Sequence, residues 1–382
     1  NAGTTVENKT IAGYYGEWDK LMLPYSRDII AKLEENELIH NYYGMLGDNS
    51  AIQLLNDAKI DYAQRYVLTT GTQYKDYPII AASTYYTYGS ASVEDYVHLG
   101  GSITESDLSS IQPYNNYLYI YTITGKQLKE WLEWSASAYE TASIVSKWSS
   151  PTMNNLMKAS GLKSLLREDW MNNWGTFTVF DGVNYVMDPS SEPRYDINGN
   201  KVSNSNRISH ITYNGKEVTE DMTFLLVINK ITAPKTPNLG VETQVVLNGF
   251  VRTQAVLSKY IKEISENGSI LPHLDYNWRV GLASKYSFIT RVPEQGEDLF
   301  EATPWYKKLL TREAGYAYYE ASYPDWNKDT VGPHIIATQA VTAPTASPYK
   351  VAVHVTDASK LKTVSFIKGD RDADFFTRTG GA

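Results

Sequence analysis

The chain has 382 residues, of which 42% are hydrophobic and 20% are charged, so it can bury a sizeable core and is not a disordered polymer. The formal net charge is −8 and no cluster of Lys and Arg occurs, which argues against DNA or RNA as a partner. With no cysteine, the chain can form neither disulfides nor thiolate-ligated zinc sites. No apolar run of about 18 residues is present, so we expect no membrane span.

The first expected elements are two helices and a strand. Residues 26–35 are predicted as a helix, with Ile29, Ile30 and Leu33 as its apolar stripe, inside a connector that covers residues 1–37. A longer helix is expected near residues 50–66, because Ser50 precedes Gln53 by three residues and apolar residues recur behind them. Residues 78–82 are typical of a short buried strand, and the polar, Tyr-rich segment 83–101 is typical of a loop.

The stretch 111–138 is predicted to form a turn, a strand and a capped helix in direct succession. Residues 113–116 are rich in turn-forming types, and residues 117–123 alternate apolar residues with tyrosines as a strand does. Thr124 and Gln127 have the spacing of a capping box. A helix is therefore expected over residues 125–139.

The second half of the chain is expected to be rich in strands. A helix is predicted around residues 156–170, but residues 176–228 have strand character with hairpin turns at Asn-Gly pairs, which suit positive φ. Another amphipathic helix is expected over residues 253–266. Together these elements predict an α+β fold in which a mixed sheet is covered by the helices near 50–66, 125–139 and 253–266.

The last part of the chain has a different character. Residues 349–356 and 361–367 alternate like strands of a β-sandwich, and the segment resembles the start of an immunoglobulin-like module. Fifty residues are too few for a whole module of that kind, so we expect a partial one. The predicted organisation is a main domain over residues 38–325 and a linker with a β-type extension over residues 326–382.

A family resemblance rests on several short motifs that occur in a fixed order. The most specific is the turn Pro113-Tyr114-Asn115-Asn116, followed by its strand and by Thr124-Gly125. These motifs resemble the C-terminal domain of 5′-nucleotidases, and within that family the surface or periplasmic 2′,3′-cyclic-nucleotide 2′-phosphodiesterase/3′-nucleotidases. The other matching stretches lie between about residues 38 and 323 and are 39–43, 50–58, 177–185, 193–196, 214–216 and 277–280.

The resemblance implies that hydrolysis belongs to a different part of the polypeptide. Such enzymes use two divalent metal ions, held by Asp, His and Asn ligands of an upstream metallophosphoesterase domain, to clamp the phosphoryl group and supply a hydroxide. The motifs of that domain are absent here, and the histidines are scattered singly. Asp196, Asn198 and Asn200 imitate a calcium loop, but Arg207 stands where calcium requires a bidentate Glu. We expect no catalytic residue, metal site or cofactor in this chain, and no hydrolysis by it alone.

The resemblance also implies a site for recognising the substrate, in which the base stacks between two aromatic rings. Tyr114 matches the first ring and Asn116 the polar residue beside it; the alternative for Tyr114 is a ring that only covers the core. At the second ring position the chain has Ile231, shortly after Asn229, and the loop expected to carry a phosphate-binding arginine has none. The further candidates for binding a nucleotide are Tyr86, Tyr88 and Asn229.

Two functions remain open. The first is a C-terminal nucleotide-recognition domain of a secreted or cell-surface cyclic phosphodiesterase or 3′- or 5′-nucleotidase of Gram-positive type, which binds a nucleotide or nucleoside weakly. Its partner would be the upstream metallophosphoesterase domain, which would hold the metal pair. The second is a degenerate scaffold or adhesion module of a surface protein, favoured by Ile231 and the missing arginine. The absence of cysteine fits an extracellular or cell-surface location.

Overall fold

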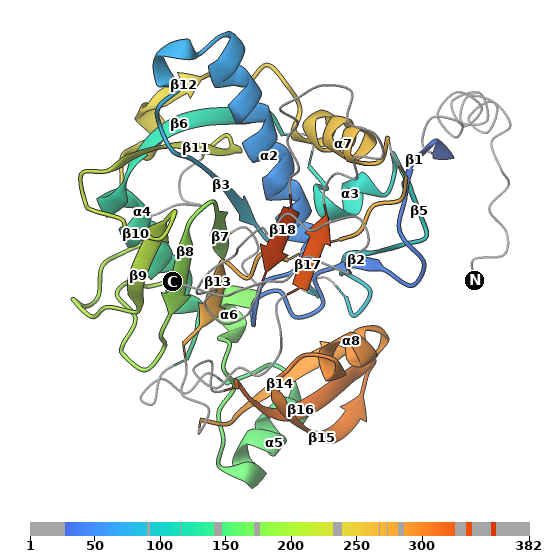
Figure 1. The fold of residues 1–382 in the computed structure, drawn as a ribbon. Coiled ribbons are helices and arrows are strands. Elements are labelled where there is room, and N and C mark those ends of the chain that lie inside the picture. The colour runs from blue at the N-terminus through green and yellow to red at the C-terminus, as the bar shows by residue number, and fades with distance from the viewer. Residues whose placement is uncertain are drawn as a thin grey trace, which may run out of the picture.

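The computed structural model describes residues 27–89, 92–114, 116–140, 147–171, 176–231, 239–266, 268–272, 274–281, 286–324, 334–337 and 353–356. Figure 1 shows a central sheet with helices on both sides and a smaller sheet at one end. The α+β class expected from the sequence is confirmed, as are the helices expected near residues 50–66, 125–139 and 253–266.

The central sheet is mixed and has the strand order β12-β6-β11-β3-β7. Strand β11 pairs in parallel with β3 and antiparallel with β6, so it lies in the middle of the sheet. The five strands are β3 (Ile79–Thr84), β6 (Leu118–Thr124), β7 (Thr178–Asp181), β11 (Thr223–Asn229) and β12 (Val245–Leu247).

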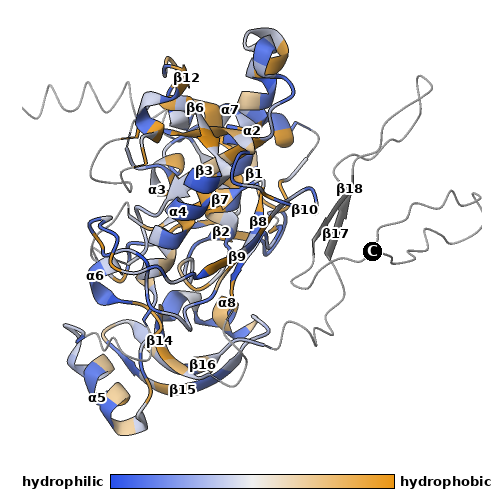
Figure 2. Ribbon diagram, turned by 90° about the vertical axis from the view of Figure 1, so that its left-hand side faces the viewer, coloured by the Kyte–Doolittle hydropathy of each residue, from blue (hydrophilic) through white to orange (hydrophobic). Residues whose placement is uncertain are grey.

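Helices cover both faces of this sheet because its strands alternate their apolar side chains. Leu225 and Val227 of β11 belong to one apolar cluster, with helices α2 (Ser50–Thr69) and α7 (Thr253–Ile264). Leu226 and Ile228 belong to another, with helix α4 (Gly125–Ser135). In Figure 2, hydrophobic and hydrophilic residues mix along the helices, as expected for elements with one buried face. The result is three layers, helix on sheet on helix.

Helix α4 begins with the predicted capping box. The Thr124 hydroxyl accepts from the Gln127 backbone N–H at 3.2 Å, and the Gln127 side chain accepts from the Thr124 N–H at 2.9 Å. Gly125 follows directly, and a Cβ at this position would lie 2.1 Å from the Thr219 carbonyl oxygen. Only glycine therefore fits at the start of this helix.

A second sheet packs beside α4 in the order β10-β9-β8-β13. Its strands are β8 (Asn184–Met187), β9 (Ile208–Tyr213), β10 (Lys216–Glu217) and β13 (Trp278–Val280). The turn between β9 and β10 contains Asn214 and Gly215, both at positive φ, as the Asn-Gly pair predicts.

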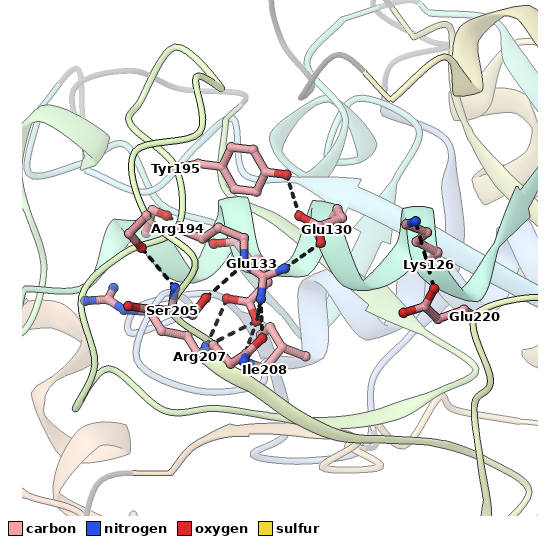
Figure 3. A network of polar contacts seen from close by, with 12 residues as sticks. Lys126, Glu130, Glu133, Arg194, Tyr195, Ser205, Arg207, Ile208 and Glu220 are labelled. Atoms are coloured by element: carbon pink, nitrogen blue, oxygen red, sulfur yellow. Dashed lines mark hydrogen bonds and ion pairs between the residues drawn. The ribbon is translucent and has the colours of Figure 1, made fainter.

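A polar network attaches this sheet to α4 (Figure 3). The Glu133 carboxylate accepts from the backbone N–H groups of Arg207 at 2.9 Å and of Ile208 at 3.1 Å. In return, Arg207 Nη1 donates to the carbonyls of Ala136 at 2.6 Å and Tyr139 at 2.9 Å, around the 3₁₀ turn η2 (Ala136–Ala138) that follows α4. This arrangement satisfies carbonyls that a helix end leaves open.

A three-stranded sheet, β14-β16-β15, forms the small end of the molecule in Figure 1, with helix α5 (Pro151–Ser160) against it. Its strands are β14 (Phe288–Pro293), β15 (Tyr306–Glu313) and β16 (Tyr316–Ser322). It has its own apolar cluster, which includes Trp148, Met153 and Ile289.

Two predicted helices differ from the structure. The expected helix over residues 26–35 is wrong: Ile29–Lys32 is strand β1, paired antiparallel with β5 (Ser102–Thr104). Its paired β-branched isoleucines suit a strand, and a partner strand distant in sequence decides the outcome. The helix expected around residues 156–170 begins earlier, at Pro151, and ends at Gly161, which has a left-handed conformation; α6 (Glu168–Met171) is separate.

The remaining elements are short. Strands β17 (His334–Ala337) and β18 (Val353–Thr356) pair antiparallel, and β18 lies inside the expected strand 349–356. Residues 1–26 and the expected strand 361–367 lie outside the described residues, so the immunoglobulin-like extension stays a prediction. Among the helices described here, none has the length and apolar character to cross a membrane. The other elements are β2 (Leu38–His40), β4 (His98–Gly100), α3 (Leu108–Ile111), α8 (Glu297–Glu301), η1 (Thr72–Tyr74), η3 (Val241–Thr243) and η4 (Glu294–Gly296).

Candidate functional site

Tyr114 and Tyr86, two of the predicted site residues, lie together at the surface. Their ring centres are 5.3 Å apart and their planes are inclined by 71°, an edge-to-face contact. Tyr114 is 45% exposed, more than a ring that only seals a core would be. The two rings therefore form a corner rather than a parallel slot, and one ring braces the other.

A polar network holds the turn that carries Tyr114. The Nε2 of the buried Gln112 side chain donates to the Tyr114 carbonyl at 2.9 Å, and the backbone carbonyl of Gln112 accepts from Gln254 Nε2 at 2.6 Å. The backbone N–H of Thr253, the first residue of α7, donates to the Asn116 carbonyl at 2.9 Å. The start of α7 therefore fixes the turn from both of its ends.

Asn229 is placed to support this turn. Its Oδ1 accepts from the Thr253 hydroxyl at 2.6 Å, and its Nδ2 donates to Gln112 Oε1 at 3.3 Å. Both ends of the amide are thus used within the protein. Asn229 would act by positioning the turn rather than by touching a ligand.

Asn116 is the polar group beside the ring. Its backbone N–H donates to the Tyr114 carbonyl at 2.8 Å, which closes the turn. Its half-buried side-chain amide forms no hydrogen bond with any of the residues whose positions the structure describes. A donor and an acceptor are therefore available next to the exposed face of Tyr114.

Tyr88 and Ile231 lie elsewhere. Tyr88 is buried, forms a β-bridge with Tyr96 and lines a different cleft. Ile231 is also buried, and its backbone N–H donates to the Tyr121 hydroxyl at 3.1 Å. Its side chain belongs to the core and provides no stacking surface; residues 232–238, which follow it, lie outside the described residues.

Arg252 also lies near this turn and is not among the residues predicted from the sequence motifs. This exposed residue precedes α7, its backbone bridges to Tyr117, and its guanidinium carbon lies 4.4 Å from the centre of the Tyr117 ring. Tyr117 is three positions after Tyr114, so their Cα atoms are at most about 11 Å apart. In the sequence, Arg252 stands directly before a predicted helix, and this position could have indicated an anion-binding residue. The helix macrodipole favours anions at the same end.

The histidines and acidic residues are the side chains that could ligate a metal ion. In the portion of the chain that the structure describes, no group of three or more His, Asp or Glu could hold a metal ion. Burial, and then His98, lowers the pKa of His40 to about 4. In the calcium-like loop, the Asp196 carboxylate accepts from the backbone N–H groups of Asn198 at 2.9 Å and Asn200 at 2.8 Å, which closes a turn. The described residues therefore do not fit the two-metal centre that hydrolysis requires.

Four aspartates lie close together near the start of α2: the buried Asp48 and Asp181 and the half-buried Asp57 and Asp275. Asp57 raises the pKa of each of the other three, and Asp275 raises that of Asp48 and Asp181. Burial is the main cause in each case, and it raises the pKa of Asp57 and that of Asp275 to about 7.

Lys59 is the cation of this buried group. Its ammonium donates to the Ala82 carbonyl at 2.6 Å and to the Ser83 hydroxyl at 2.5 Å, and burial lowers its pKa to about 7. Asp48 Oδ2 and Asp181 Oδ1 are buried and accept no hydrogen bond from any described residue. We refer to these four aspartates with Lys59 as the aspartate cluster.

The comparisons with known proteins agree with the resemblance seen in the sequence. A family model described as "5'-nucleotidase, C-terminal domain" matches residues 39–239. A 2′,3′-cyclic-nucleotide 2′-phosphodiesterase/3′-nucleotidase of Haemophilus influenzae is 29% identical over 310 residues, which cover 78% of this chain and 44% of that protein. The trifunctional nucleotide phosphoesterase protein YfkN of Bacillus subtilis is 27% identical over 287 residues, which cover 73% of this chain and 18% of that protein.

Solved structures give a weaker likeness. A putative 5′-nucleotidase from Staphylococcus aureus matches with a TM-score of 0.48 and 16% identity, over 73% of this chain and 45% of that one. The chain therefore spans less than half the length of the relatives it matches.

Proposed function

The chain belongs to the 5′-nucleotidase C-terminal domain family, and on this basis we propose that it is the nucleotide-recognition part of a secreted or cell-surface phosphoesterase. In this proposal, a metallophosphoesterase domain of the same polypeptide holds a divalent metal pair and cleaves the phosphate ester. The substrate class is a 2′,3′-cyclic or 3′-nucleotide, or a 5′-nucleotide. The names and the greater length of the curated relatives support this reading.

The observation that carries the proposal is the exposed Tyr114 ring, braced by Tyr86 and flanked by the available amide of Asn116. A base stacked on such a ring gains roughly 1 to 3 kcal/mol, with little dependence on which base it is. The Asn116 amide can donate to and accept from a base edge. With a single stacking ring, the nucleotide is expected to bind weakly. Weak binding suits a domain that holds a substrate while another domain cleaves it.

Arg252 is our candidate for the phosphate contact. It replaces the arginine that is missing from the loop at residues 83–90, and Tyr117 orients its guanidinium. The Gln254–Gln112 and Thr253–Asn116 hydrogen bonds tie the segment that carries Arg252 to the Tyr114 turn. A phosphate attached to the stacked nucleoside would then meet a permanent positive charge.

Titration of the chain with adenosine and with 3′-AMP, followed by tyrosine fluorescence, tests both parts. We expect saturable binding in the millimolar range, tighter for 3′-AMP. Tyr114→Ala should weaken both ligands by about 10-fold, the equivalent of one stacked base. Arg252→Gln should weaken 3′-AMP and leave adenosine unchanged.

The matched control is Tyr306→Ala, because Tyr306 is an exposed tyrosine of β15 outside the site. Its binding curves should overlay those of the unmodified chain. If neither ligand saturates and Tyr114→Ala has no effect, nucleotide recognition is refuted.

The second candidate function is a degenerate scaffold or adhesion module. The burial of Ile231 in the core favours it, because no stacking ring stands at that position. This reading predicts no saturable fluorescence change with either ligand, so the same titration separates the two functions.

A further inference from the structure

A lysine and an asparagine lie side by side on the buried face of α2. Lys59 is 1% exposed and Asn56 is fully buried, and because they are three positions apart on the helix their side chains meet. The Lys59 Nζ lies 3.4 Å from Asn56 Oδ1. The side-chain carbonyl carbon of Asn56 is one bond beyond this oxygen, so Nζ is at most about 4.6 Å from that carbon. A small rotation of the long lysine side chain therefore brings an amine and a carboxamide to reacting distance.

Two strands of the central sheet complete the arrangement around the carboxamide. Ala81 of β3 pairs with Asp181 of β7, and Ser83 is two positions further along β3, so Ser83 and Asp181 share one face of the sheet. The Ser83 hydroxyl donates to Asn56 Oδ1 at 2.6 Å, and Asp181 Oδ2 accepts from Asn56 Nδ2. The carboxamide is thus held at its oxygen by a hydroxyl and at its nitrogen by a carboxyl group.

The hydrogen bonds of Lys59 leave its lone pair for Asn56. Burial lowers the pKa of Lys59 to about 7, so at pH 8 most of this amine is neutral and has two N–H groups. These groups donate to the Ala82 carbonyl at 2.6 Å and to the Ser83 hydroxyl at 2.5 Å. The third direction, toward Asn56, then carries the lone pair. A desolvated, neutral lysine is a nucleophile.

Asp181 is the acid beside the nitrogen that would have to leave. Burial, and then Asp275 and Asp48, raise the pKa of Asp181 well above its usual range, so its carboxyl group retains its proton near neutral pH. Asp181 is 3% exposed and contacts Asn56 Nδ2 directly. Because all these groups are buried, bulk water is kept from attacking the same carbon.

We propose that Lys59 and Asn56 form an intramolecular amide bond in the folded chain. The Lys59 Nζ attacks the Asn56 Cγ, and the Ser83 hydroxyl donates to the oxygen as negative charge develops on it. Asp181 gives its proton to Nδ2, the Cγ–Nδ2 bond breaks and ammonia leaves. The proton that Lys59 loses replaces the one that Asp181 gives, so no oxidant, metal or cofactor is needed. This inference does not rest on the proposed nucleotide binding.

The bond would change the aspartate cluster permanently. Until it forms, Lys59 titrates as a buried amine; afterwards Lys59 is a neutral amide and no longer contributes to the dependence of stability on pH. The bond also closes a covalent ring across one turn of α2.

Intact-mass spectrometry of the full chain tests the proposal. Over several days at pH 8, the folded chain should become lighter by the mass of one ammonia molecule. Trypsin should then fail to cut after Lys59, because an acylated lysine is not cleaved, and should release residues 33–65 as one peptide with the same mass deficit. This peptide separates the cross-link from succinimides at Asn-Gly pairs, which lose ammonia without blocking trypsin.

Variants assign the parts. Lys59→Arg has no neutral amine at pH 8 and should keep the full mass. Asp181→Asn and Ser83→Ala should each slow the loss of ammonia by about 100-fold or more. The matched control is Lys75→Arg, at an exposed lysine outside α2, which should react like the unmodified chain.

The decisive measurement uses the unmodified chain, so it does not depend on whether a variant folds. The proposal is overturned if the folded chain keeps its full mass, or if it loses ammonia while trypsin still cuts normally after Lys59. It is also overturned if Lys59→Arg, folded by circular dichroism, still loses ammonia from Asn56.

Discussion

Two polar networks lie beside the central sheet, one at α4 and one at α2, and they balance their charges differently. The network at α4 contains two acids and two arginines: Glu130 and Glu133 with Arg194 and Arg207. The aspartate cluster at α2 contains four acids and one lysine. All four groups of the α4 network can be ionised while the network has no net charge. The aspartate cluster would carry a net negative charge if all its groups were ionised.

The pKa values express this difference. Burial raises the pKa of Glu133, but the Arg207 and Ile208 N–H groups and Arg194 oppose the shift. In the aspartate cluster, neighbouring carboxyls instead add to the effect of burial and raise the pKa of Asp48, Asp181 and Asp275 further. A buried polar network whose charges balance therefore connects two elements at any pH near neutrality. One whose charges do not balance makes the free energy of unfolding depend on pH.

The largest expected effect is the loss of the balanced network. Arg207→Met removes the donors to Ala136 and Tyr139 and leaves the buried acids with one fewer cation. We expect the free energy of unfolding to fall by about 3 to 5 kcal/mol. Equilibrium unfolding in urea at pH 7 measures this; the exposed pair of Arg312 provides the comparison, since Arg312→Met should change little.

The next effect is a dependence of stability on pH. Asp57 and Asp275 have pKa values of about 7 in the folded chain and near 3.8 when unfolded, so the folded chain binds more protons between those values. Stability should therefore fall as pH rises from about 4 to 7.

Two other groups modify this profile. His40, with its pKa lowered to about 4, works in the opposite direction over part of the window. Lys59, with its pKa lowered to about 7, makes stability rise again at higher pH. Urea unfolding at unit pH steps from 4 to 9 measures the sum. A profile that rises steadily from pH 4 to 7 would contradict the unbalanced aspartate cluster.

Asp57→Asn sharpens this result by removing one of the excess charges. Its Oδ1 can still accept from Gln53, as in the native 3.0 Å bond. We expect the variant to be more stable than the unmodified chain by about 1 to 2 kcal/mol at pH 8 and equal to it at pH 4, where the native carboxyl is protonated. Asp76→Asn, at an exposed position, should show no such difference between the two pH values.

The smallest expected effect on stability comes from the uncharged capping box at the start of α4. Thr124→Ala removes the acceptor for the Gln127 N–H and should lower the free energy of unfolding by about 1 kcal/mol. The loss should be the same at pH 5 and pH 8, because no titrating group takes part. A strong pH dependence in this variant would show that the cap is coupled to a titrating group.

The parts of the fold that were predictable are those with a local cause. The alternation in β6 and the capping box at Thr124 are present in short stretches of sequence, and the structure has them where they were expected. The helix over residues 26–35 was wrong because pairing with β5, about 70 residues away, decides that segment. Local propensity contains no information about such a partner.

The candidate site divides in the same way. Tyr114 and Asn116 followed from a contiguous turn motif, and their role in binding stays a prediction. The support from Asn229 and the placement of Arg252 depend on contacts between distant segments. No spacing along the chain reveals these contacts, because the folded core creates them.

The hydrogen bonds that hold the Tyr114 turn have one further consequence. They reach its backbone carbonyls, from Gln112 and Thr253, and none of them uses the Tyr114 ring itself. The backbone of the turn is therefore held independently of which side chain residue 114 carries. A lineage could exchange tyrosine for phenylalanine or tryptophan here and retune ligand preference while these backbone hydrogen bonds remain.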